Sequence, residues 1–332
     1  MLPRRRRLTP AVADVRRAAR TALEAISERA VSPSVLVALS GGPDSLALAA
    51  ATAFEARRAG LRAGAVIIDH RLQTGSRDAA ARASAQAQEL GLDPVIVRSV
   101  TVGSDGGPEA AARAARYAAL AEVAAETGAT AVLLGHTLDD QAETVLLGLA
   151  RGSGATSVQG MAPVAGLYVR PLLGIRRLTT VQFCADSGLE PWLDPQNGDR
   201  AFARVRVREI VLPVLEAELG PGIAEALART AEQLREDTEA LDHFAEEIAE
   251  DLAEHSEAGI SLPVAALEAN PPALRQRLIR LAVFSEFHVS LSRSHTLEIA
   301  RLVTDWHGQG PIDVPGVRVE RRGRLLVFTA RV

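Results

Sequence analysis

The fold is decided by the stretch Val35-Leu36-Val37-Ala38-Leu39, which runs directly into Ser40-Gly41-Gly42-Pro43-Asp44-Ser45. The first five residues are apolar and predict a buried strand, and Leu46-Ala47-Leu48 after the loop predicts the start of a helix. Glycines between a strand and a helix let the backbone approach an anion, and the helix dipole adds partial positive charge there. The stretch therefore predicts a loop that binds phosphate groups.

The polar side chains of this loop support the prediction. Ser40 and Ser45 can donate hydroxyl hydrogen bonds to phosphate oxygens, whereas Asp44 requires a divalent cation between itself and a phosphate and is assigned to Mg²⁺. The loop lacks the Gly-Lys-Ser/Thr ending of a Walker loop, so a kinase or GTPase of that type is not expected. The residues predicted to bind nucleotide in this loop are Ser40, Gly41, Gly42, Pro43, Asp44 and Ser45.

Short β-branched runs alternate with helical patterns from residue 34 onward. This alternation is typical of a parallel sheet with crossover helices, so we expect an α/β fold with a doubly wound, mostly parallel sheet. Ligands of such sheets bind beyond the carboxyl ends of the strands. In chain order the expected elements are a strand at 35–39, a helix at 46–59, a strand at 65–68, a helix at 77–90, a strand at 95–100, a helix at 109–127, a strand at 131–134 and a helix at 138–150.

The length of the chain, 332 residues, is more than one core usually serves. Residues 1–33 begin with a run of arginines at 4–7, and an amphipathic pattern follows, so we expect a basic arm and a helix. Residues 34–210 should form the nucleotide-binding domain. Residues 211–332 should form a helical C-terminal domain with a short β tail.

The pattern within this C-terminal part is more specific. Residues 212–254 and 274–307 have the spacing of long helices, and 312–332 have the pattern of two or three short strands with turns at Gly316 and Gly323. We find no internal repeat in the sequence. The predicted C-terminal domain is therefore mainly helical.

The composition excludes several classes of protein. Hydrophobic residues make up 47% of the chain and charged residues 23%, as in folded globular proteins. No stretch is apolar over the length of a bilayer, so we expect no membrane span and a cytoplasmic location. The one cysteine, Cys184, cannot form an internal disulfide or a multi-cysteine metal or iron-sulfur site. The sequence contains no lysine, which excludes a Schiff-base lysine and a Walker lysine.

The pattern Ser-Gly-Gly-x-Asp-Ser resembles the signature of the PP-loop ATP pyrophosphatases, which cleave ATP between the α and β phosphates and form adenylated intermediates. Further motifs follow the other predicted strands, and the combined pattern over about residues 34–210 resembles the tRNA(Ile)-lysidine synthase family. These motifs are Ile68-Asp69-His70-Arg71-Leu72, Glu109-Ala110-Ala111-Ala112-Arg113, Arg116-Tyr117, Gly135-His136-Thr137-Leu138-Asp139-Asp140-Gln141-Ala142-Glu143-Thr144, Arg151-Gly152-Ser153-Gly154, Arg170-Pro171-Leu172 and Trp192-Leu193-Asp194-Pro195-Gln196-Asn197.

The resemblance implies a reaction with three substrates. ATP, with Mg²⁺, activates the C2 oxygen of the wobble cytidine in tRNA(Ile) with a CAU anticodon. The ε-amine of free L-lysine then attacks, and the products are lysidine, AMP and pyrophosphate. The oligomeric state stays open between a monomer and a homodimer.

The resemblance and the local patterns assign roles to the acidic residues. Asp69 and His70, after the second strand, are expected to bind the nucleotide. Asp139 and Asp140 open the helix at 138–150 and suit Mg²⁺ or the substrate ammonium, with helix capping as the alternative. Asp139 is expected to share Mg²⁺ with the phosphate loop. Glu143 either fixes lysine or faces solvent.

Basic residues complete the predicted site. His136 is expected to assist proton transfer, with a structural hydrogen-bonded role as the alternative. Arg113 and Arg116 lie three residues apart on one helix face, and they either clamp a phosphate or the tRNA, or are solvated helix charges. The residues expected to act in catalysis are Asp44, Arg113, His136, Asp139 and Asp140. The residues expected to contact lysine or tRNA are Arg116, Glu143, Arg204, Arg206 and Arg208.

Three other functions compete with this interpretation. A tRNA thiolation enzyme of the same superfamily requires several cysteines to handle sulfur, and Cys184 alone does not supply them. An ammonia-dependent synthetase would not need the helical extension or the arginines near the C-terminus. A non-catalytic nucleotide sensor would not need the carboxylates Asp44, Asp139 and Asp140.

Overall fold

A computed structural model describes most of the chain in two compact units, Met1–Glu232 and Gln233–Val332. The first unit carries the predicted α/β fold, and the second carries a separate small fold. Among the helices of the described ranges, none has the length and apolar character that a bilayer crossing demands. The residues described are 8–30, 32–69, 75–101, 103, 107–152, 154–192, 198–252, 254–256 and 259–331.

A six-stranded sheet forms the centre of the first unit. Its strands stand in the order β3-β2-β1-β4-β6-β5, and every neighbouring pair is parallel except β5 and β6. The order reverses between β1 and β4, which is where doubly wound sheets bind their ligands. The predicted doubly wound, mostly parallel sheet is therefore confirmed. The strands are β1 (Ser34–Ala38), β2 (Arg62–Asp69), β3 (Val95–Ser99), β4 (Ala131–Leu134), β5 (Val164–Ala165) and β6 (Tyr168–Val169).

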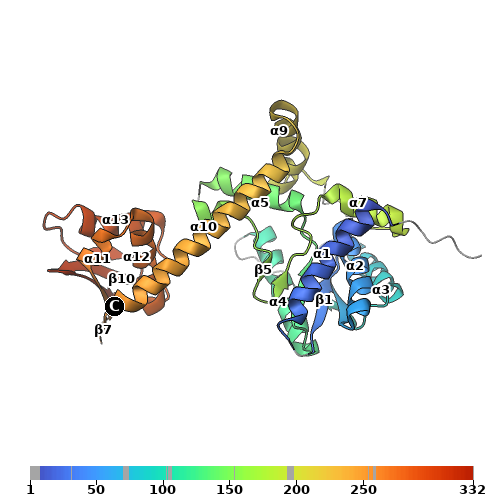
Figure 1. Cartoon of the computed structure of the whole chain (residues 1–332), viewed down its shortest axis with the longest axis horizontal. Helices are drawn as coiled ribbons and strands as arrows, with labels where there is room; N and C mark the ends of the chain where they lie inside the picture. Colours follow the sequence, from blue (N-terminus) through green and yellow to red (C-terminus); the bar gives the residue numbers. More distant parts are fainter. Residues whose placement is uncertain are drawn as a thin grey trace, which may run out of the picture. The chain divides into compact units, whose positions relative to one another are not determined.

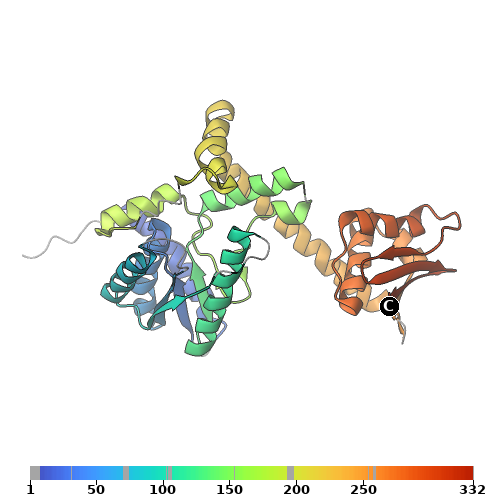
Figure 2. The same cartoon turned by 180° about the vertical axis from the view of Figure 1, so that it is seen from behind.

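Helices cover both faces of this sheet, as Figure 1 and the reverse view in Figure 2 show. Alternate residues of β1 explain the two layers, because successive side chains of a strand point to opposite faces. Val35 and Val37 join the apolar core around α1, α2, α3 and α7, whereas Leu36 joins the core around α4. The helices are α1 (Pro10–Ser27), α2 (Pro43–Ala59), α3 (Ser76–Glu89), α4 (Pro108–Thr127) and α7 (Arg177–Ser187), of which α7 was not predicted.

The helix predicted within residues 1–33 is α1, and it is part of the first unit. Val15, Ala19 and Leu23 lie along its apolar stripe and are buried in the core that α2 shares. On α2, the buried carboxylate of Glu55 accepts a hydrogen bond from Arg20 of α1 at 2.9 Å. The arginine run at residues 4–7 lies outside the described residues.

Residues 211–232 also pack with the first unit. The helices α9 (Leu212–Leu219) and α10 (Ile223–Leu252) bring Leu212 and Ala224 into one apolar cluster with Leu138 and Ala142 of α5 (Leu138–Arg151). The structure therefore divides the chain after Glu232, whereas the sequence pattern predicted a boundary after residue 210.

The prediction of two long uninterrupted C-terminal helices is wrong. Gly220 and Gly222 have φ angles of 96° and 98°, which a helix cannot continue through, and they separate α9 from α10. His288 has a φ angle of 55° and ends α12 (Pro272–Phe287). Ser292 then caps α13 (Arg293–Thr304) by accepting a backbone N–H hydrogen bond.

The second unit is built on a five-stranded antiparallel sheet in the order β7-β8-β11-β10-β9. The predicted terminal strands form three of its five members, and the pair β7 and β8 was not predicted. Phe328 and Leu262, from neighbouring strands, are buried in one apolar cluster together with Ile279 of α12 and Ile299 of α13. The other elements of the second unit are β7 (Glu254–Ser256), β8 (Gly259–Pro263), α11 (Val264–Ala269), β9 (Ile312–Val314), β10 (Val317–Arg322) and β11 (Leu325–Ala330).

Gly135 allows the end of β4 to approach the phosphate loop. A Cβ atom on this residue would lie 3.0 Å from both the Cα and the backbone N of Ser45. Both neighbours are backbone atoms of the first turn of α2, so they cannot rotate away as the end of a side chain can. A side chain at position 135 would therefore displace the loop.

We expect Gly135→Ala to weaken ATP binding by about tenfold, a loss of about 1.4 kcal/mol, because it shifts the first turn of α2. The same overpacking should lower the free energy of unfolding by about 1–3 kcal/mol. Titration calorimetry with ATP and urea unfolding measure the two effects. Gly310→Ala is the matched control, since a Cβ there meets nothing within 4 Å. Wild-type ATP affinity in Gly135→Ala would contradict the dependence of the loop on this contact.

Candidate active site

The predicted phosphate loop joins β1 to α2 at the carboxyl edge of the sheet. Gly41 has a φ angle of 85°, which favours glycine, and its carbonyl accepts the backbone N–H of Trp192 at 2.9 Å. The hydroxyls of Ser40 and Ser45 lie 3.0 Å apart. No side chain of the described residues caps α2 at Gly42, so the first N–H groups of this helix are available to an anion.

A reciprocal capping box begins α5. Oδ2 of Asp140 accepts the backbone N–H and the hydroxyl of Thr137, both at 2.8 Å, and Thr137 Oγ1 accepts the N–H of Asp140 at 3.4 Å. The alternative role of helix capping therefore applies to Asp140. Its second oxygen, Oδ1, takes no part in the cap and faces the site.

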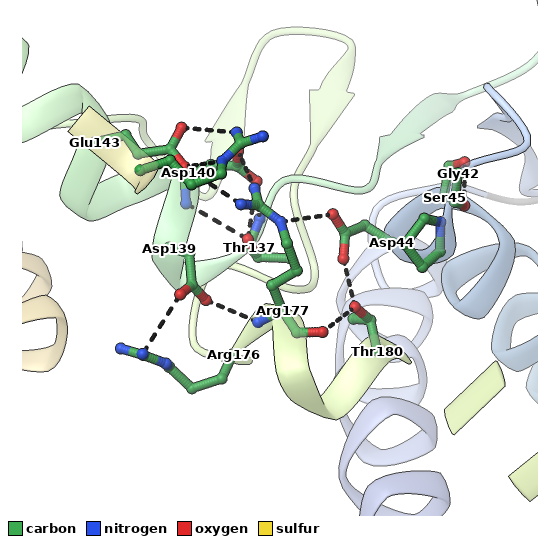
Figure 3. A network of polar contacts seen from close by, with 12 residues as sticks. Gly42, Asp44, Ser45, Thr137, Asp139, Asp140, Glu143, Arg176, Arg177 and Thr180 are labelled. Atoms are coloured by element: carbon green, nitrogen blue, oxygen red, sulfur yellow. Dashed lines mark hydrogen bonds and ion pairs between the residues drawn. The ribbon is translucent and has the colours of Figure 1, made fainter. Parts of the chain in front are cut away.

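One guanidinium joins the phosphate loop to α5 (Figure 3). Nε of Arg177, the first residue of α7, donates to Asp44 Oδ2 at 3.2 Å. Its Nη2 and Nη1 atoms donate to Asp140 Oδ1 at 2.7 Å and to Glu143 Oε1 at 3.3 Å. Burial acts to lower the pKa of Arg177, but the three carboxylates outweigh it and raise that pKa. The guanidinium is therefore charged and binds three carboxylates at once.

The pKa values of the two aspartates beside Arg177, Asp44 and Asp140, are shifted in opposite directions. Burial raises the pKa of Asp44, although the hydroxyl of Thr180 donates to its Oδ1 and Arg177 lies beside it. Burial also acts to raise the pKa of Asp140, but Arg177 and the hydrogen bonds from Thr137 outweigh it and lower that pKa. Asp140 is thus held as a carboxylate, and Asp44 is the more readily protonated of the pair.

Glu143 is the most deeply buried carboxylate of the site, with a side chain that is 0% exposed. Arg208 binds it through Nε at 2.6 Å and through Nη2 at 3.0 Å, and Arg204 lies 3.6 Å from its second oxygen. Arg177 adds a further contact to Oε1. The alternative in which Glu143 faces solvent is therefore wrong. Its charge is balanced by three arginines, one from α7 and two from the helical residues 203–211.

Asp139 faces a different set of partners from Asp140. Its Oδ2 accepts the backbone N–H of Arg177 at 2.7 Å, and its Oδ1 lies 3.5 Å from Nη2 of Arg176. Asp139 therefore caps the start of α7, and Figure 3 places it on the opposite side of Arg177 from Asp44. The structure does not bring these two predicted Mg²⁺ ligands together, and in the described ranges no three His, Cys, Asp or Glu side chains form a metal-binding group.

A group of cationic side chains surrounds Tyr117 on α4. Arg113 donates to the Tyr117 hydroxyl at 3.2 Å, and the guanidinium of Arg116 lies 5.6 Å from the ring centroid. Burial acts to raise the pKa of Tyr117, but Arg170 and the other guanidinium groups lower it. The Nε atoms of Arg116 and Arg170 are buried and have no hydrogen-bond partner among the described residues. These buried donors suit an anionic ligand.

His136 lies beside this group, in the loop after β4. Burial lowers its pKa to about 4, although Asp140 acts in the opposite direction. Its ring is therefore neutral at pH 7, and its Nδ1 atom is buried without a hydrogen-bond partner in the described part of the chain. A neutral imidazole offers hydrogen bonds but does not change charge near neutral pH, where proton transfer by His136 was expected.

The other predicted residues are more dispersed. Asp69 is buried at the end of β2, and His70 lies outside the described residues. Arg206 donates to the carbonyl oxygens of Arg200 at 2.8 Å and Ala201 at 2.7 Å. Arg206 therefore stabilises the backbone just before its own helix. Its hydrogen bonds go to these carbonyl oxygens, whereas Arg204 and Arg208 contact Glu143.

Comparison with known proteins identifies the family. The PP-loop domain model matches residues 15–215, and the TilS substrate binding domain model matches residues 262–326. The chain is 64% identical over 295 residues to the tRNA(Ile)-lysidine synthase of Leifsonia xyli subsp. xyli, and the match covers 89% of each chain. The chain belongs to the tRNA(Ile)-lysidine synthase family. The family enzyme of Thermobifida fusca is 52% identical over 322 residues, covering 96% of this chain and 98% of its relative.

This membership confirms the predicted family and its class, the ATP-dependent ligases. A solved U34-tRNA thiolase, NcsA from Methanococcus maripaludis with its [4Fe-4S] cluster, has the same fold, with a TM-score of 0.57 and 18% identity over 68% of this chain and 80% of that one. Cys184 is the single cysteine here, and it donates to the carbonyl of Pro43 at 3.5 Å. Burial and Asp44 raise its pKa to about 12, so it is a packed thiol.

Sequence reasoning missed the residues of α7 that organise the site. Arg177 and Thr180 contact Asp44 of the phosphate loop, and Arg177 also contacts Asp140 of α5. A signal was available, because Arg176-Arg177 precede apolar residues at helical spacing and Gly188 follows as a helix stop. The motif Arg170-Pro171-Leu172 suggested no role for Arg170, which the structure places beside Tyr117.

The pKa of His136 predicts a dependence of stability on pH. An unfolded histidine binds a proton below about pH 6.5, but folded His136 does so only near pH 4. Above about pH 6.5 the neutral His136 costs the fold nothing, because the histidine is also neutral in the unfolded chain. As pH falls from there towards about 4, the unfolded chain binds a proton that the folded protein does not, so the free energy of unfolding decreases. Between these pH values, wild-type protein should lose on the order of 2 kcal/mol more stability than His136→Asn.

Urea unfolding of both proteins at several pH values between 7 and 4.5 measures this difference. The exposed His307→Asn is the control for the loss of a histidine, and it should follow the wild-type protein. Parallel stability curves for wild type and His136→Asn would contradict the buried, neutral state of His136.

Proposed function

We propose that the chain joins L-lysine to C2 of the wobble cytidine of tRNA(Ile) with a CAU anticodon, through an adenylated cytidine. The observation that carries this proposal is the Arg177 bridge, because it joins the phosphate loop at Asp44 to the carboxylates Asp140 and Glu143. A site for a triphosphate and a site for a cationic amine therefore adjoin each other. Family membership supports the same reaction.

The phosphate loop supplies the nucleotide half of the site. The open N–H groups at the start of α2 and the hydroxyls of Ser40 and Ser45 offer donors to the phosphates. Asp44 presents carboxylate oxygens, which Mg²⁺ prefers as ligands, so it would hold the metal. A bound Mg²⁺ would offset the negative charge of pyrophosphate as it leaves. The hydrogen bond that Asp139 accepts from the backbone of Arg177 supports a role in capping α7, so we propose Asp44 and not Asp139 for the metal.

The start of α5 supplies the carboxylates that would bind the ammonium group of lysine. Asp140 is held ionised by Arg177 and Thr137, and Glu143 is buried, so both present acceptor oxygens away from bulk water. Carboxylates in such a place favour an ammonium group over a neutral ligand. The chain has no lysine of its own to occupy this position, so the ammonium comes from a free ligand.

The cationic group around Tyr117 supplies the RNA side. Arg116 and Arg170 have buried Nε donors with no hydrogen-bond partner in the part of the chain that the structure describes, and Arg113 is exposed beside them. A phosphate of the activated nucleotide or of the tRNA would satisfy these donors. The second unit, which matches the TilS substrate binding domain at residues 262–326, would hold another part of the tRNA.

The direct test is incorporation of labelled lysine into tRNA(Ile) with a CAU anticodon. With ATP and Mg²⁺ the protein should transfer lysine and release AMP and pyrophosphate in equal amounts. Asp44→Asn should lower the rate by about 10²-fold or more, because it removes the carboxylate that would hold Mg²⁺ beside the phosphates. Gln182→Ala is a control for an exposed residue of α7. No incorporation by wild-type protein would exclude the proposed reaction.

Arg113→Ala tests the proposed RNA side. Loss of one phosphate contact should weaken tRNA binding and reduce the slope of log affinity against log salt by about 1. Filter binding at several salt concentrations measures both quantities. Arg29→Ala is the matched control, because this exposed arginine precedes β1 at the opposite edge of the sheet. An unchanged salt slope in Arg113→Ala would remove that residue from the RNA surface.

A further inference from the structure

The Arg177 guanidinium occupies the position where a cationic substrate would bind. Its side chain is 23% exposed and its three nitrogens contact Asp44, Asp140 and Glu143. Every carboxylate proposed above for the metal or the amine is therefore already bound to one internal cation. An ammonium group of lysine cannot gain the same oxygens until Arg177 releases them.

The other partners of these carboxylates do not replace Arg177. Arg208 binds Glu143 at 2.6 Å but lies 3.7 Å from Asp140. Oδ2 of Asp140 is occupied by the capping box, and its other oxygen, Oδ1, accepts a hydrogen bond from Nη2 of Arg177 at 2.7 Å. Departure of Arg177 would therefore free one oxygen of Asp140 and leave Glu143 paired with Arg208. That combination leaves one acceptor oxygen for an incoming ammonium, whose positive charge would replace that of Arg177 beside Asp140.

The nucleotide offers Arg177 another partner. Its Nε contacts Asp44, which lies in the first turn of α2, where the phosphates are proposed to bind. A guanidinium forms bidentate hydrogen bonds with phosphate as well as with carboxylate, and a triphosphate carries more negative charge than any one carboxylate here. The backbone of Arg177 is fixed by Asp139, so only the side chain needs to turn.

We propose that Arg177 is a positioning residue that orders substrate binding: it blocks the amine site until ATP draws its guanidinium away, and lysine then binds. This inference rests on the proposed function. It makes ATP and lysine binding interdependent, and such coupling is reciprocal, so lysine must raise the affinity for ATP by the same factor.

Titration calorimetry with L-lysine tests the order, with Mg²⁺ present and with or without α,β-methylene-ATP, which cannot be cleaved at the adenylation step. For wild-type protein the nucleotide should raise the affinity for lysine by roughly tenfold or more, within the range of coupled sites. In Arg177→Met, lysine should bind without nucleotide nearly as well as with it. The ratio of the two affinities, rather than either alone, is the readout, because a merely structural role would not change it.

Arg176→Met is the matched control. This neighbouring arginine contacts Asp139 and Glu225 but not Asp44, Asp140 or Glu143, and it should keep the wild-type ratio. Lysine binding by wild-type protein that is independent of nucleotide would overturn the inference, and this measurement requires no variant to fold. A wild-type ratio retained in Arg177→Met would overturn it as well. Failure of wild-type protein to bind lysine in any condition would instead overturn the proposed function, and the inference with it.

Discussion

The site depends on the balance of charge around carboxylates that have left bulk water. Glu143 is 0% exposed and Asp140 is buried beside it, at the point where the sheet reverses its strand order. An unpaired carboxylate in such a place costs several kcal/mol, so the fold requires compensating positive charge within contact distance. Arg177, Arg204 and Arg208 provide it, and they come from segments far from α5 in the sequence. The electrostatic requirement thus fixes where α7 and the residues after 203 must lie.

Arginine is suited to this task in a way that lysine is not. A guanidinium directs five N–H donors in a planar fork, so Arg177 reaches three carboxylates and Arg208 binds both oxygens of Glu143. An ammonium is a compact point charge and would satisfy fewer acceptors from the same backbone position. The absence of lysine from the sequence is consistent with codon bias, but at this site it also keeps internal ammonium groups away from the carboxylates proposed to receive one.

The features that the sequence predicted are those with local causes. The strand, glycine loop and helix start at residues 35–48 lie within one short stretch, and the alternation of Val35, Leu36 and Val37 between two cores follows from strand geometry alone. Arg177 was missed because its contact with Asp44 spans 133 positions in the sequence. The pair β7 and β8 was missed because β8 pairs with β11, far along the chain, and a short strand without local partners has little signal of its own. The breaks at Gly220 and Gly222 had a local signal that the helical spacing around them outweighed.

The role of His136 and the division of labour between Asp139 and Asp140 required the structure for a different reason. Adjacent residues on a helix point in different directions, so one carboxylate caps α7 while the other caps its own helix and faces the site. Side chains of this kind, rather than the fold, determine which chemistry a site can support. The thiolase with its [4Fe-4S] cluster shares the fold, so one fold accommodates more than one chemistry. Here Cys184 is a packed thiol, and the surface beside the phosphate loop is built from ionised and buried carboxylates. Such a surface favours a cationic partner over a neutral one. The negative charge of this surface is therefore set by α5, whereas the open N–H groups of the phosphate loop are set by α2.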